Sequence, residues 1–326
     1  MRAVLCTEYG SYENLVVSDV PDPVPGPDEV LIEVHSASLN FPDLLVIQGL
    51  YQFKPEPPFV PGAEASGVIA KLGEGVTGLA VGQRVTTVGI AGGFAQLRVV
   101  DAQSVIPLAA GVDFDTAAAT TMTYGTSYHA LVQRAEMAGG ETLLVLGASG
   151  GVGSAAVEIG KALGATVIAA ASSDDKLAFC QDIGADETIN YATEDLTSRV
   201  KEMTGGRGVD VVFDPVGGDL AESAFRAIGW KGRHLVVGFT AGDIPRLPLN
   251  LPLLKGASVV GVFWGAFTAH EPETAAANLS AISTMIAEGS LQPRATEVFP
   301  LDGAVAAFGL LATRTAMGKI VLSEIN

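Results

Sequence analysis

The sequence has 326 residues, of which 48% are apolar, so it is long enough to bury more than one hydrophobic core. Its 19 basic and 36 acidic residues give a formal net charge of −17, which disfavours binding to a nucleic-acid backbone. We therefore expect no nucleic-acid partner. No apolar run reaches the roughly 20 residues that span a bilayer, so we expect no membrane partner either.

The N-terminal sequence and the cysteines bear on cellular location. MRAVLCTEYG lacks a long apolar stretch followed by small residues, so no secretory signal is expected and the cytoplasm is the predicted location. Cys6 and Cys180 lie far apart and form no CxxC pair, which argues against a disulfide framework and a structural zinc site. We expect both to be core or surface thiols.

Up to about residue 110, short β-branched runs alternate with Pro/Gly turns, which predicts an antiparallel barrel. The expected strands are EVLIEVHSASLN, SGVIAKLG, QRVTTVG and AQLRVVD, and VPDPVPGPDE is an expected turn segment. From about residue 115 the pattern changes, and TAAATTMTYGTSYHALVQRA predicts a helix over 116–135.

Strands and helices then alternate, which predicts parallel strands joined by crossover helices. The expected order is TLLVL (142–146), a helix from Val152, TVIAA (166–170), a helix from Asp174, ETIN, a helix from Glu194, and VDVVFD. HLVVGF (234–239) and SVVGVFW (258–264) add two buried strands, so the six strands predict an α/β, doubly wound parallel sheet.

The end of the chain is expected to return to the first domain. It contains the helical pattern TAAANLSAISTMIAEG and a closing strand, KIVL. The expected domains are therefore 1–119 and 120–266, with 267–326 completing the first of them.

A glycine-rich turn follows the strand TLLVL and opens a helix: Gly147, Ala148, Ser149, Gly150, Gly151, Val152 and Gly153. Gly150 allows the backbone to approach a pyrophosphate, and Gly153 allows the helix to pack closely on the strand. The free amides and the helix dipole then hold the negative charge. Ala148 replaces the first glycine of the GxGxxG pattern. Because strand and helix flank the turn, we predict dinucleotide binding here.

The second strand indicates which dinucleotide is bound. The position that offers a carboxylate to the ribose in NAD enzymes falls at Ala171 or Ser172, and neither is acidic. Ser172, Ser173 and Lys176 instead offer hydroxyls and a cation that suit the 2′-phosphate of NADPH. Asp174 and Asp175 are expected as acids of the first helical turn. The alternative for Lys176 is an ordinary solvated helix lysine.

With these motifs in place, the sequence resembles, over essentially its whole length, the quinone oxidoreductases, the zeta-crystallin-like branch of the medium-chain dehydrogenase/reductase superfamily. The matching stretches are SLNFPDLLVIQGLY, PFVPGAEASGVI, TMTYGTSYHAL, LGASGGVG, FDPVGG, NLPLLKGASVVGVFWG and MGKIVL. The resemblance implies a GroES-like β-barrel domain, a Rossmann domain, a cleft between them, and a homodimer joined through SVVGVFWG.

Zinc-dependent relatives carry a histidine ligand in a GHE-type segment, a cysteine near the Asn40 segment and a four-cysteine lobe. Here the segment reads Gly62-Ala63-Glu64, and neither cysteine stands at a ligand position, so we expect no metal. The histidines are scattered and are expected to be structural: His35, His129, His234 and His270.

The resemblance also implies roles near the reacting groups. Asn40 and Thr123 would hold the nicotinamide end or a nearby substrate oxygen. Tyr51, in the loop-like segment QGLYQFKPEPPF, would line the substrate mouth as a proton donor, the alternative being that it packs the loop. Asp214 ends the fourth strand, where a turn-forming role is expected.

Further cofactor contacts are implied along the second domain. Tyr191 would pack near the adenosine phosphate, and Gly238-Phe239 would follow the fifth strand beside the cofactor. Phe263 and Trp264 would approach the nicotinamide region, although Phe263 also fits a plain core strand. Lys319 would either reach the cofactor or stand as a solvated lysine before a strand.

These observations predict an enzyme that transfers hydride from NADPH to a quinone without a metal. The alternative is reduction of the C=C bond of an enone, haloacrylate or enoyl thioester with the same cofactor. The acidic balance of the chain weighs against the phosphates of an acyl-CoA. A second alternative is a protein that binds NADPH and catalyses nothing.

Overall fold

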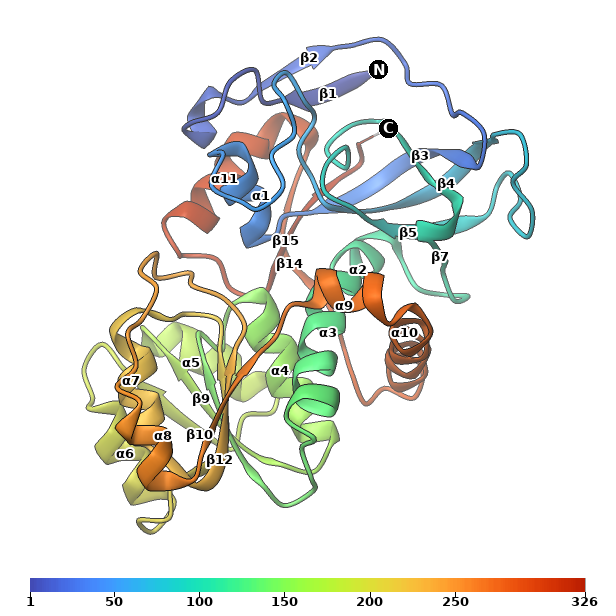
Figure 1. The fold of residues 1–326 in the computed structure, drawn as a ribbon. Helices are drawn as coiled ribbons and strands as arrows, with labels where there is room; N and C mark the ends of the chain where they lie inside the picture. The colour runs from blue at the N-terminus through green and yellow to red at the C-terminus, as the bar shows by residue number, and fades with distance from the viewer. Residues whose placement is uncertain (326) are drawn as a thin grey trace. The chain divides into compact units, whose positions relative to one another are not determined.

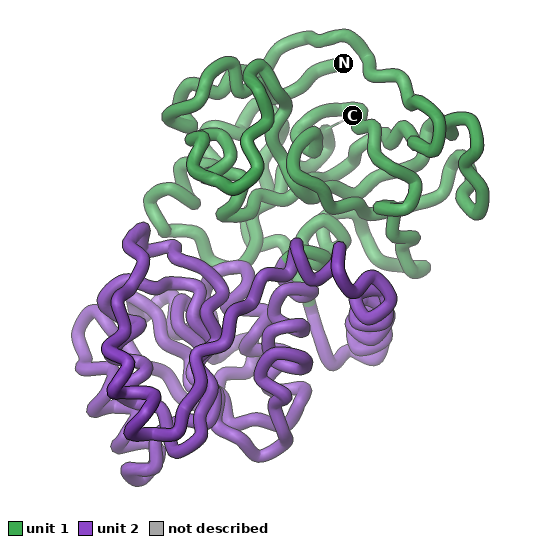
Figure 2. Tube along the Cα trace, viewed as in Figure 1, with its two compact units in different colours: residues 1–122, 293–326 green, residues 123–292 purple. Residues whose placement is uncertain are grey.

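The computed structural model describes residues 1–325 and divides the chain into two compact units. Unit 1 contains Met1–Met122 and the segment from Pro293 onward, and unit 2 contains Thr123–Gln292 (Figure 2). Each is described by itself. Within residues 1–325, no helix combines the length and the apolar character needed to cross a membrane.

Unit 1 is built on a seven-stranded sheet in which β6 pairs with β3 outside the main order β14-β15-β3-β4-β5-β7. The strands from the first part of the chain pair antiparallel, as predicted, and β14 pairs parallel with β15. The strands are β3 (Glu29–Ser38), β4 (Glu64–Leu72), β5 (Arg84–Val88), β6 (Leu97–Asp101), β7 (Val105–Pro107), β14 (Ala295–Phe299) and β15 (Lys319–Ser323). A separate two-stranded sheet joins β1 (Arg2–Leu5) to β2 (Val16–Asp19).

Short helices close the core of unit 1. They are the α-helices α1 (Phe41–Ile47), α2 (Phe114–Ala118) and α11 (Ala304–Ala312), and the 3-10 turns η1 (Tyr12–Asn14), η2 (Ala102–Ser104) and η4 (Leu301–Gly303). Ile32 and Ile69 of the sheet are buried in one cluster with Phe94 and Phe308. The two phenylalanine rings meet edge to face with centroids 5.9 Å apart, a favourable geometry for aromatic pairs.

Unit 2 contains the predicted six-stranded parallel sheet, in the order β10-β9-β8-β11-β12-β13. The strands are β8 (Thr142–Leu146), β9 (Thr166–Ala171), β10 (Glu187–Asn190), β11 (Val209–Asp214), β12 (Ile228–Val236) and β13 (Ser258–Gly261). The chain leaves β8 toward β9 and later returns to its other side with β11. Ligands of doubly wound sheets bind at such a switch point, beyond the carboxyl ends of the strands.

Helices cover both faces of this sheet (Figure 1). The helices of unit 2 are α3 (Thr121–Tyr128), the π-helix η3 (His129–Arg134), α4 (Gly151–Ala162), α5 (Asp174–Asp182), α6 (Leu196–Met203), α7 (Gly218–Arg226), α8 (Asn250–Lys255), α9 (Trp264–His270) and α10 (Pro272–Ala287), of which α9 packs on α3 and η3. Leu143 and Val145 of β8 enter one buried cluster, and Leu144 and Leu146 enter another. This alternation explains why the strand reads as a continuous apolar run.

Three predicted elements differ most clearly from the structure, while others, such as the helix predicted from Glu194 that begins at Leu196, are shifted slightly at their ends. The helix over 116–135 is divided into α2, α3 and η3, and Thr120 Oγ1 donates to the carbonyl of Thr116, a local bond that competes with regular helix. The strand over 258–264 ends at Gly261, because this apolar run lies at the edge of the sheet and is not a buried strand. The strand over 234–239 begins earlier, at Ile228, and ends at Val236.

The chain leaves unit 2 after Gln292, whereas the expected boundary lay after residue 266. Helix α10 accounts for the difference. Its Ile282 is buried in the core of unit 2, and its Asn278 exchanges two side-chain hydrogen bonds with Gln133 of η3. The pattern TAAANLSAISTMIAEG is helical, as predicted, but it packs on the Rossmann unit.

Both cysteines are free and buried. Cys6 belongs to the core cluster of unit 1, and Cys180 belongs to a core cluster of unit 2. Burial raises the pKa of the Cys6 thiol above its ordinary value and that of Cys180 to about 12.

The turn between β8 and α4 depends on backbone contact. A Cβ atom on Gly153 would lie 2.3 Å from the carbonyl oxygen of Gly147 and 2.8 Å from the Cα of Ala148. The first turn of α4 therefore packs directly on the end of β8, the role predicted for Gly153. Gly147 itself has φ of 55°, the left-handed region that favours glycine.

We expect Gly153→Ala to destabilise unit 2 by about 2 kcal/mol, because the added methyl must push helix and turn apart. The matched control is Gly139→Ala, where the new Cβ has its nearest neighbour at 3.5 Å, so the change should stay within about 0.5 kcal/mol. Urea denaturation followed by circular dichroism measures both. Equal stability of the two variants would contradict the packing argument.

Candidate active site

The N-terminus of α4 provides free backbone amides at the carboxyl edge of the sheet. Gly150 is the N-cap residue, and no side chain caps the helix. The N–H groups of a first helical turn have no partner within the helix, and the helix dipole adds positive potential there. The hydroxyl of Ser127 on α3 donates to the carbonyl of Val152 and ties this turn to its neighbour. The turn is suited to hold a pyrophosphate.

Next to this turn, the end of β9 carries a hydroxyl and a cation. Lys176 Nζ donates to Ser172 Oγ at 3.1 Å, and Ser173 is the N-cap of α5. Burial lowers the pKa of the Lys176 ammonium. The amide of Tyr191 donates to the carbonyl of Ala171, so Tyr191 lies beside the same strand end.

Asp174 and Asp175 lie in the first turn of α5, as predicted. Asp174 is turned toward the end of β10, where its Oδ1 accepts a hydrogen bond from the side-chain amide of Asn190 at 2.8 Å. Its carboxylate is thereby engaged by Asn190. The polar groups at the end of β9 are then a hydroxyl and an ammonium, which complement a phosphate.

The end of β11 forms the predicted turn. Asp214 Oδ1 accepts hydrogen bonds from the amides of Val216 and Gly217 at 2.9 and 2.8 Å, which confirms its turn-forming role. Its Oδ2 lies 3.0 Å from Nε2 of the buried His234. The amide of Gly238 donates to the Asp214 carbonyl, and a Cβ on Gly217 would touch the ring of Phe239. Gly238 and Phe239 therefore follow the fifth strand beside this turn.

Three further predicted residues lie on α3 and at the start of α9. Thr123 is buried on α3. The Trp264 indole covers α3 at Gly125, where a Cβ would meet three of its ring atoms at 2.9 Å. Phe263 is 49% exposed and lies after the end of β13, so its alternative as a core-strand residue is wrong.

Unit 1 holds Asn40 and Lys319 in direct contact. Lys319 begins β15 and is buried, so the alternative of a solvated lysine is wrong. Its Nζ donates to Oδ1 of Asn40 at 2.7 Å and to the carbonyl of Leu39 at 3.2 Å, and it lies 3.5 Å from Oε2 of Glu64. Burial lowers the pKa of Lys319, whereas Glu64 and Asp43 favour the charged form.

The same unit buries a second pair of charged residues, Asp43 and Arg98. Asp43 accepts hydrogen bonds from the amides of Asn40 and Ala63, and Arg98 donates to the carbonyl of Ala63. Burial raises the pKa of Asp43 to about 7, against the opposing effect of its two amide donors, and lowers that of Arg98 to about 10. Position 63, where zinc-dependent relatives are expected to carry histidine, is therefore held from both sides.

Sequence reasoning did not identify Asp43 or Arg98, and it treated Glu64 only as part of a segment without a zinc ligand. A usable signal was present. Asp43 and Arg98 are single charged residues within the apolar stretches FPDLLVI and QLRVV. A charged side chain at a buried position requires a partner. One buried charge in a unit therefore predicts a second one of opposite sign.

Tyr51 follows α1 and is half-buried. Its ring centroid lies 6.3 Å from that of Phe53. Burial, and secondarily the Asp43 carboxylate, raise the pKa of the phenol, so it remains protonated at neutral pH. A protonated phenol is a hydrogen-bond donor.

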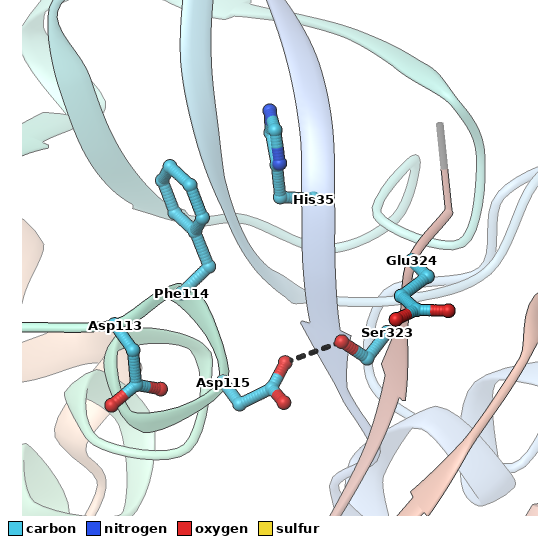
Figure 3. A pocket seen from close by; sticks show the side chains of 6 residues that line it. All are labelled: His35, Asp113, Phe114, Asp115, Ser323 and Glu324. Atoms are coloured by element: carbon cyan, nitrogen blue, oxygen red, sulfur yellow. Dashed lines mark hydrogen bonds between the residues drawn. The ribbon is translucent and has the colours of Figure 1, made fainter.

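A small cavity of about 230 Å³ lies elsewhere in unit 1 (Figure 3). Its lining consists of His35, Asp113, Phe114, Asp115, Ser323 and Glu324. Two of its acids already serve local structure, because Asp113 caps α2 and Asp115 accepts from the Ser323 hydroxyl at 2.7 Å. His35 stacks on Phe114 with centroids 4.4 Å apart.

Of the two remaining histidines, one stacks on an aromatic ring and the other lies at the end of a helix. His129 stacks on Phe267 with centroids 3.8 Å apart, and His270 ends α9. Across residues 1–325, no group of three or more His, Cys, Asp or Glu side chains is arranged to hold a metal ion.

Two protein-family models match the chain. The family described as alcohol dehydrogenase GroES-like domain matches residues 26–110, and the family described as zinc-binding dehydrogenase matches residues 151–282. They fall on the sheet of unit 1 and on the Rossmann unit, respectively.

Similar proteins extend the match to nearly the whole chain. The quinone oxidoreductase-like protein 2 homolog of Nematostella vectensis is 37% identical over 325 residues, 99% of this chain and 88% of the relative. The structure of Escherichia coli quinone oxidoreductase complexed with NADPH superposes with a TM-score of 0.92 at 28% identity, covering 99% of this chain and all of that chain. The CurK enoyl reductase superposes with a TM-score of 0.89 at 26% identity, covering 99% and 98%.

The resemblance drawn from the motifs is thereby confirmed, as is the combination of a GroES-like domain with a six-stranded Rossmann sheet. The chain is an oxidoreductase that belongs to the quinone oxidoreductase branch of the medium-chain dehydrogenase/reductase superfamily.

Proposed function

We propose that this protein is an NADPH-dependent reductase that transfers hydride to a quinone without a metal ion. The observation that carries the proposal is the pairing of Lys176 Nζ with Ser172 Oγ at the end of β9, where neither Ala171 nor Ser172 is acidic. A carboxylate there would select NADH, whereas a hydroxyl and an ammonium suit a 2′-phosphate. Similarity to an NADPH-bound quinone oxidoreductase supports the assignment.

The cofactor fits residues of unit 2. The uncapped first turn of α4, with the glycines at 147, 150, 151 and 153, takes the pyrophosphate. Ser172, Ser173 and Lys176 take the 2′-phosphate, and Tyr191 packs beside the adenosine. Gly238-Phe239, Phe263 and Trp264 line the remainder of the cofactor.

Bound NADPH supplies the hydride from its nicotinamide ring. The protein orients the acceptor and stabilises the negative charge that develops on its oxygen. Thr123 and Asn40 serve the nicotinamide end. Tyr51, whose raised pKa keeps the phenol protonated, donates a hydrogen bond to the acceptor oxygen. Because water can protonate a hydroquinone anion, Tyr51 assists binding more than proton transfer.

Reduction of a conjugated C=C bond is the second candidate. Similarity to the CurK enoyl reductase favours it, because the two chains share their fold over nearly their whole length. The net charge of −17 disfavours an acyl-CoA, whose phosphates would need a basic rim. An NADPH-binding protein without catalysis would bind the cofactor tightly and turn over no acceptor.

We also propose a homodimer formed through β13. This strand ends the sheet order, so one of its edges has no neighbouring strand in the described part of the chain. Nearby apolar side chains are exposed, with Val259 at 49%, Leu254 at 71% and Trp230 at 71%. The Trp230 ring lies against Gly256 at the end of α8, which connects this surface to the strand. Large exposed apolar patches mark interaction surfaces.

Lys176→Ala should raise the KM for NADPH about tenfold and change the KM for NADH less than about twofold, because one charge-assisted hydrogen bond to the 2′-phosphate is lost. Initial rates with both cofactors measure this. The control is Lys201→Ala, the loss of an exposed lysine on α6, which should leave both constants unchanged. If Lys176→Ala left the KM for NADPH unchanged, the assignment of Lys176 to the 2′-phosphate would be rejected.

A panel of acceptors tests the reaction class. We expect NADPH oxidation, followed by the absorbance of the reduced nicotinamide, to be fastest with benzoquinones and naphthoquinones, and to be insensitive to a chelator. Faster turnover of cyclohexenone or crotonyl-CoA would establish the C=C reductase instead. Tight NADPH binding without turnover of any acceptor would indicate the non-catalytic alternative.

Val259→Asp should convert the dimer to a monomer, because it places a charge in an apolar contact. Light scattering coupled to gel filtration gives the mass. Val81→Asp, at a 63% exposed position of unit 1, is the matched control and should not change the mass. A monomeric wild-type protein would reject this interface.

A further inference from the structure

The carboxylate of Glu64 is the meeting point of four groups in unit 1. Oε2 accepts hydrogen bonds from Ser38 Oγ at 2.8 Å and from Asn40 Nδ2 at 3.2 Å, and it forms the 3.5 Å ion pair with Lys319. Oε1 accepts from the amide of Met122 at 2.8 Å. Glu64 is fully buried and Lys319 nearly so, with exposed fractions of 0% and 5%.

Stability alone is a poor explanation for this arrangement. Removing two charges from water costs several kcal/mol per ion, and a well-packed apolar pair is often as stable or more so. Asp43 and Arg98 are buried in the same unit, which adds to that cost. What such a network provides is a fixed geometry, because each polar atom has only one satisfactory set of partners.

The network fixes the orientation of the Asn40 amide. Its Oδ1 accepts from the Lys319 ammonium at 2.7 Å, and its Nδ2 donates to the Glu64 carboxylate. A flipped amide would place N–H groups against the ammonium and the carbonyl oxygen against the carboxylate. Both contacts would then be repulsive, so only one orientation of Asn40 is compatible with the pair.

The network also fixes the segment that leads to Thr123. Met122 lies in the first turn of α3, and its amide is held by Glu64. Thr123 is the next residue in the chain. One carboxylate therefore holds both the side-chain amide of Asn40, between β3 and α1, and the backbone N–H of Met122, the residue before Thr123.

We propose that Glu64 and Lys319 are positioning residues for hydride transfer, which act through the Asn40 side chain and the backbone N–H of Met122 without touching the cofactor. The inference rests on the proposed function, in which Asn40 and Thr123 serve the nicotinamide end. Lys319 thereby takes a role other than the cofactor contact implied by resemblance, because it is buried and three oxygens of unit 1 surround its ammonium, which has three N–H donors.

The test separates kcat from cofactor binding. Lys319→Met should lower kcat at least about tenfold, because small displacements of positioning groups reduce the rate of transfer. The Kd for NADPH should change less than about twofold, since the phosphate contacts lie in unit 2. Lys319→Arg restores a buried cation with several donors and should recover most of kcat. Lys161→Met removes a lysine from the exposed pair with Asp186 and is the matched control, with unchanged kcat.

A double variant separates the loss of positioning from a loss of stability caused by an unpaired buried charge. Lys319→Met leaves the Glu64 charge buried without its cation, which is destabilising, whereas Glu64→Gln with Lys319→Met leaves neither charge. The double variant should fold, bind NADPH and retain the kcat defect, because Asn40 has lost both orienting charges. A double variant with kcat within about twofold of wild type would overturn the positioning role, and so would a raised Kd for NADPH in Lys319→Met.

The two proposals fail in different ways. If wild-type protein turned over no quinone or enone, the proposed function would be rejected, and the positioning role with it. If wild-type protein were active and the variants lost only thermal stability, with kcat intact, the positioning role alone would be rejected.

Discussion

The close approach of α4 to the end of β8 is the contact on which the arrangement of unit 2 depends. Only hydrogen fits on Gly153, because the carbonyl oxygen of Gly147 would lie 2.3 Å from any Cβ. This contact places the first turn of α4 at the carboxyl edge of the sheet, beside the ends of β9 and β11. The groups proposed to bind phosphate and the Asp214 turn then lie along one edge because parallel strands end together.

Unit 1 follows a different principle. Its sheet packs on an apolar core, but the segment around position 63 is held by hydrogen bonds from buried charged side chains. Asp43 and Arg98 hold Ala63, while Glu64 and Lys319 hold Asn40. The result is a rigid polar network in the region where zinc-dependent relatives are expected to place their metal. Charge pairing can provide geometric order of the kind that a metal ion provides by coordination.

The sequence predicted unit 2 well because its signals are local. The strands at 142–146, 187–190 and 209–214 and the start of α5 at Asp174 coincide with the structure, since apolar runs, turn residues and first-turn acids mark their own boundaries. The edge strand was predicted too long, because an apolar run does not tell a buried strand from an exposed edge. The division of helix 116–135 depends on packing that no local pattern reports.

The candidate site was predicted only where a motif carries its own chemistry. The glycine turn and the Ser172–Lys176 pair could be recognised in the sequence, because residue type and spacing alone identify them. The contacts of Lys319 could not be predicted from the sequence. Its partners Asn40 and Glu64 lie in the first part of the chain, and only the pairing of β15 with β3 brings them together.

The burial of both thiols has a chemical consequence for the proposed reduction of conjugated carbonyl compounds. Quinones and enones alkylate thiolates, and the thiolate is the reactive form of cysteine. With its pKa raised to about 12, Cys180 is almost entirely protonated at neutral pH, and the pKa of Cys6 is shifted in the same direction. Neither Cys6 nor Cys180 therefore presents a ready thiolate that the proposed acceptors could arylate.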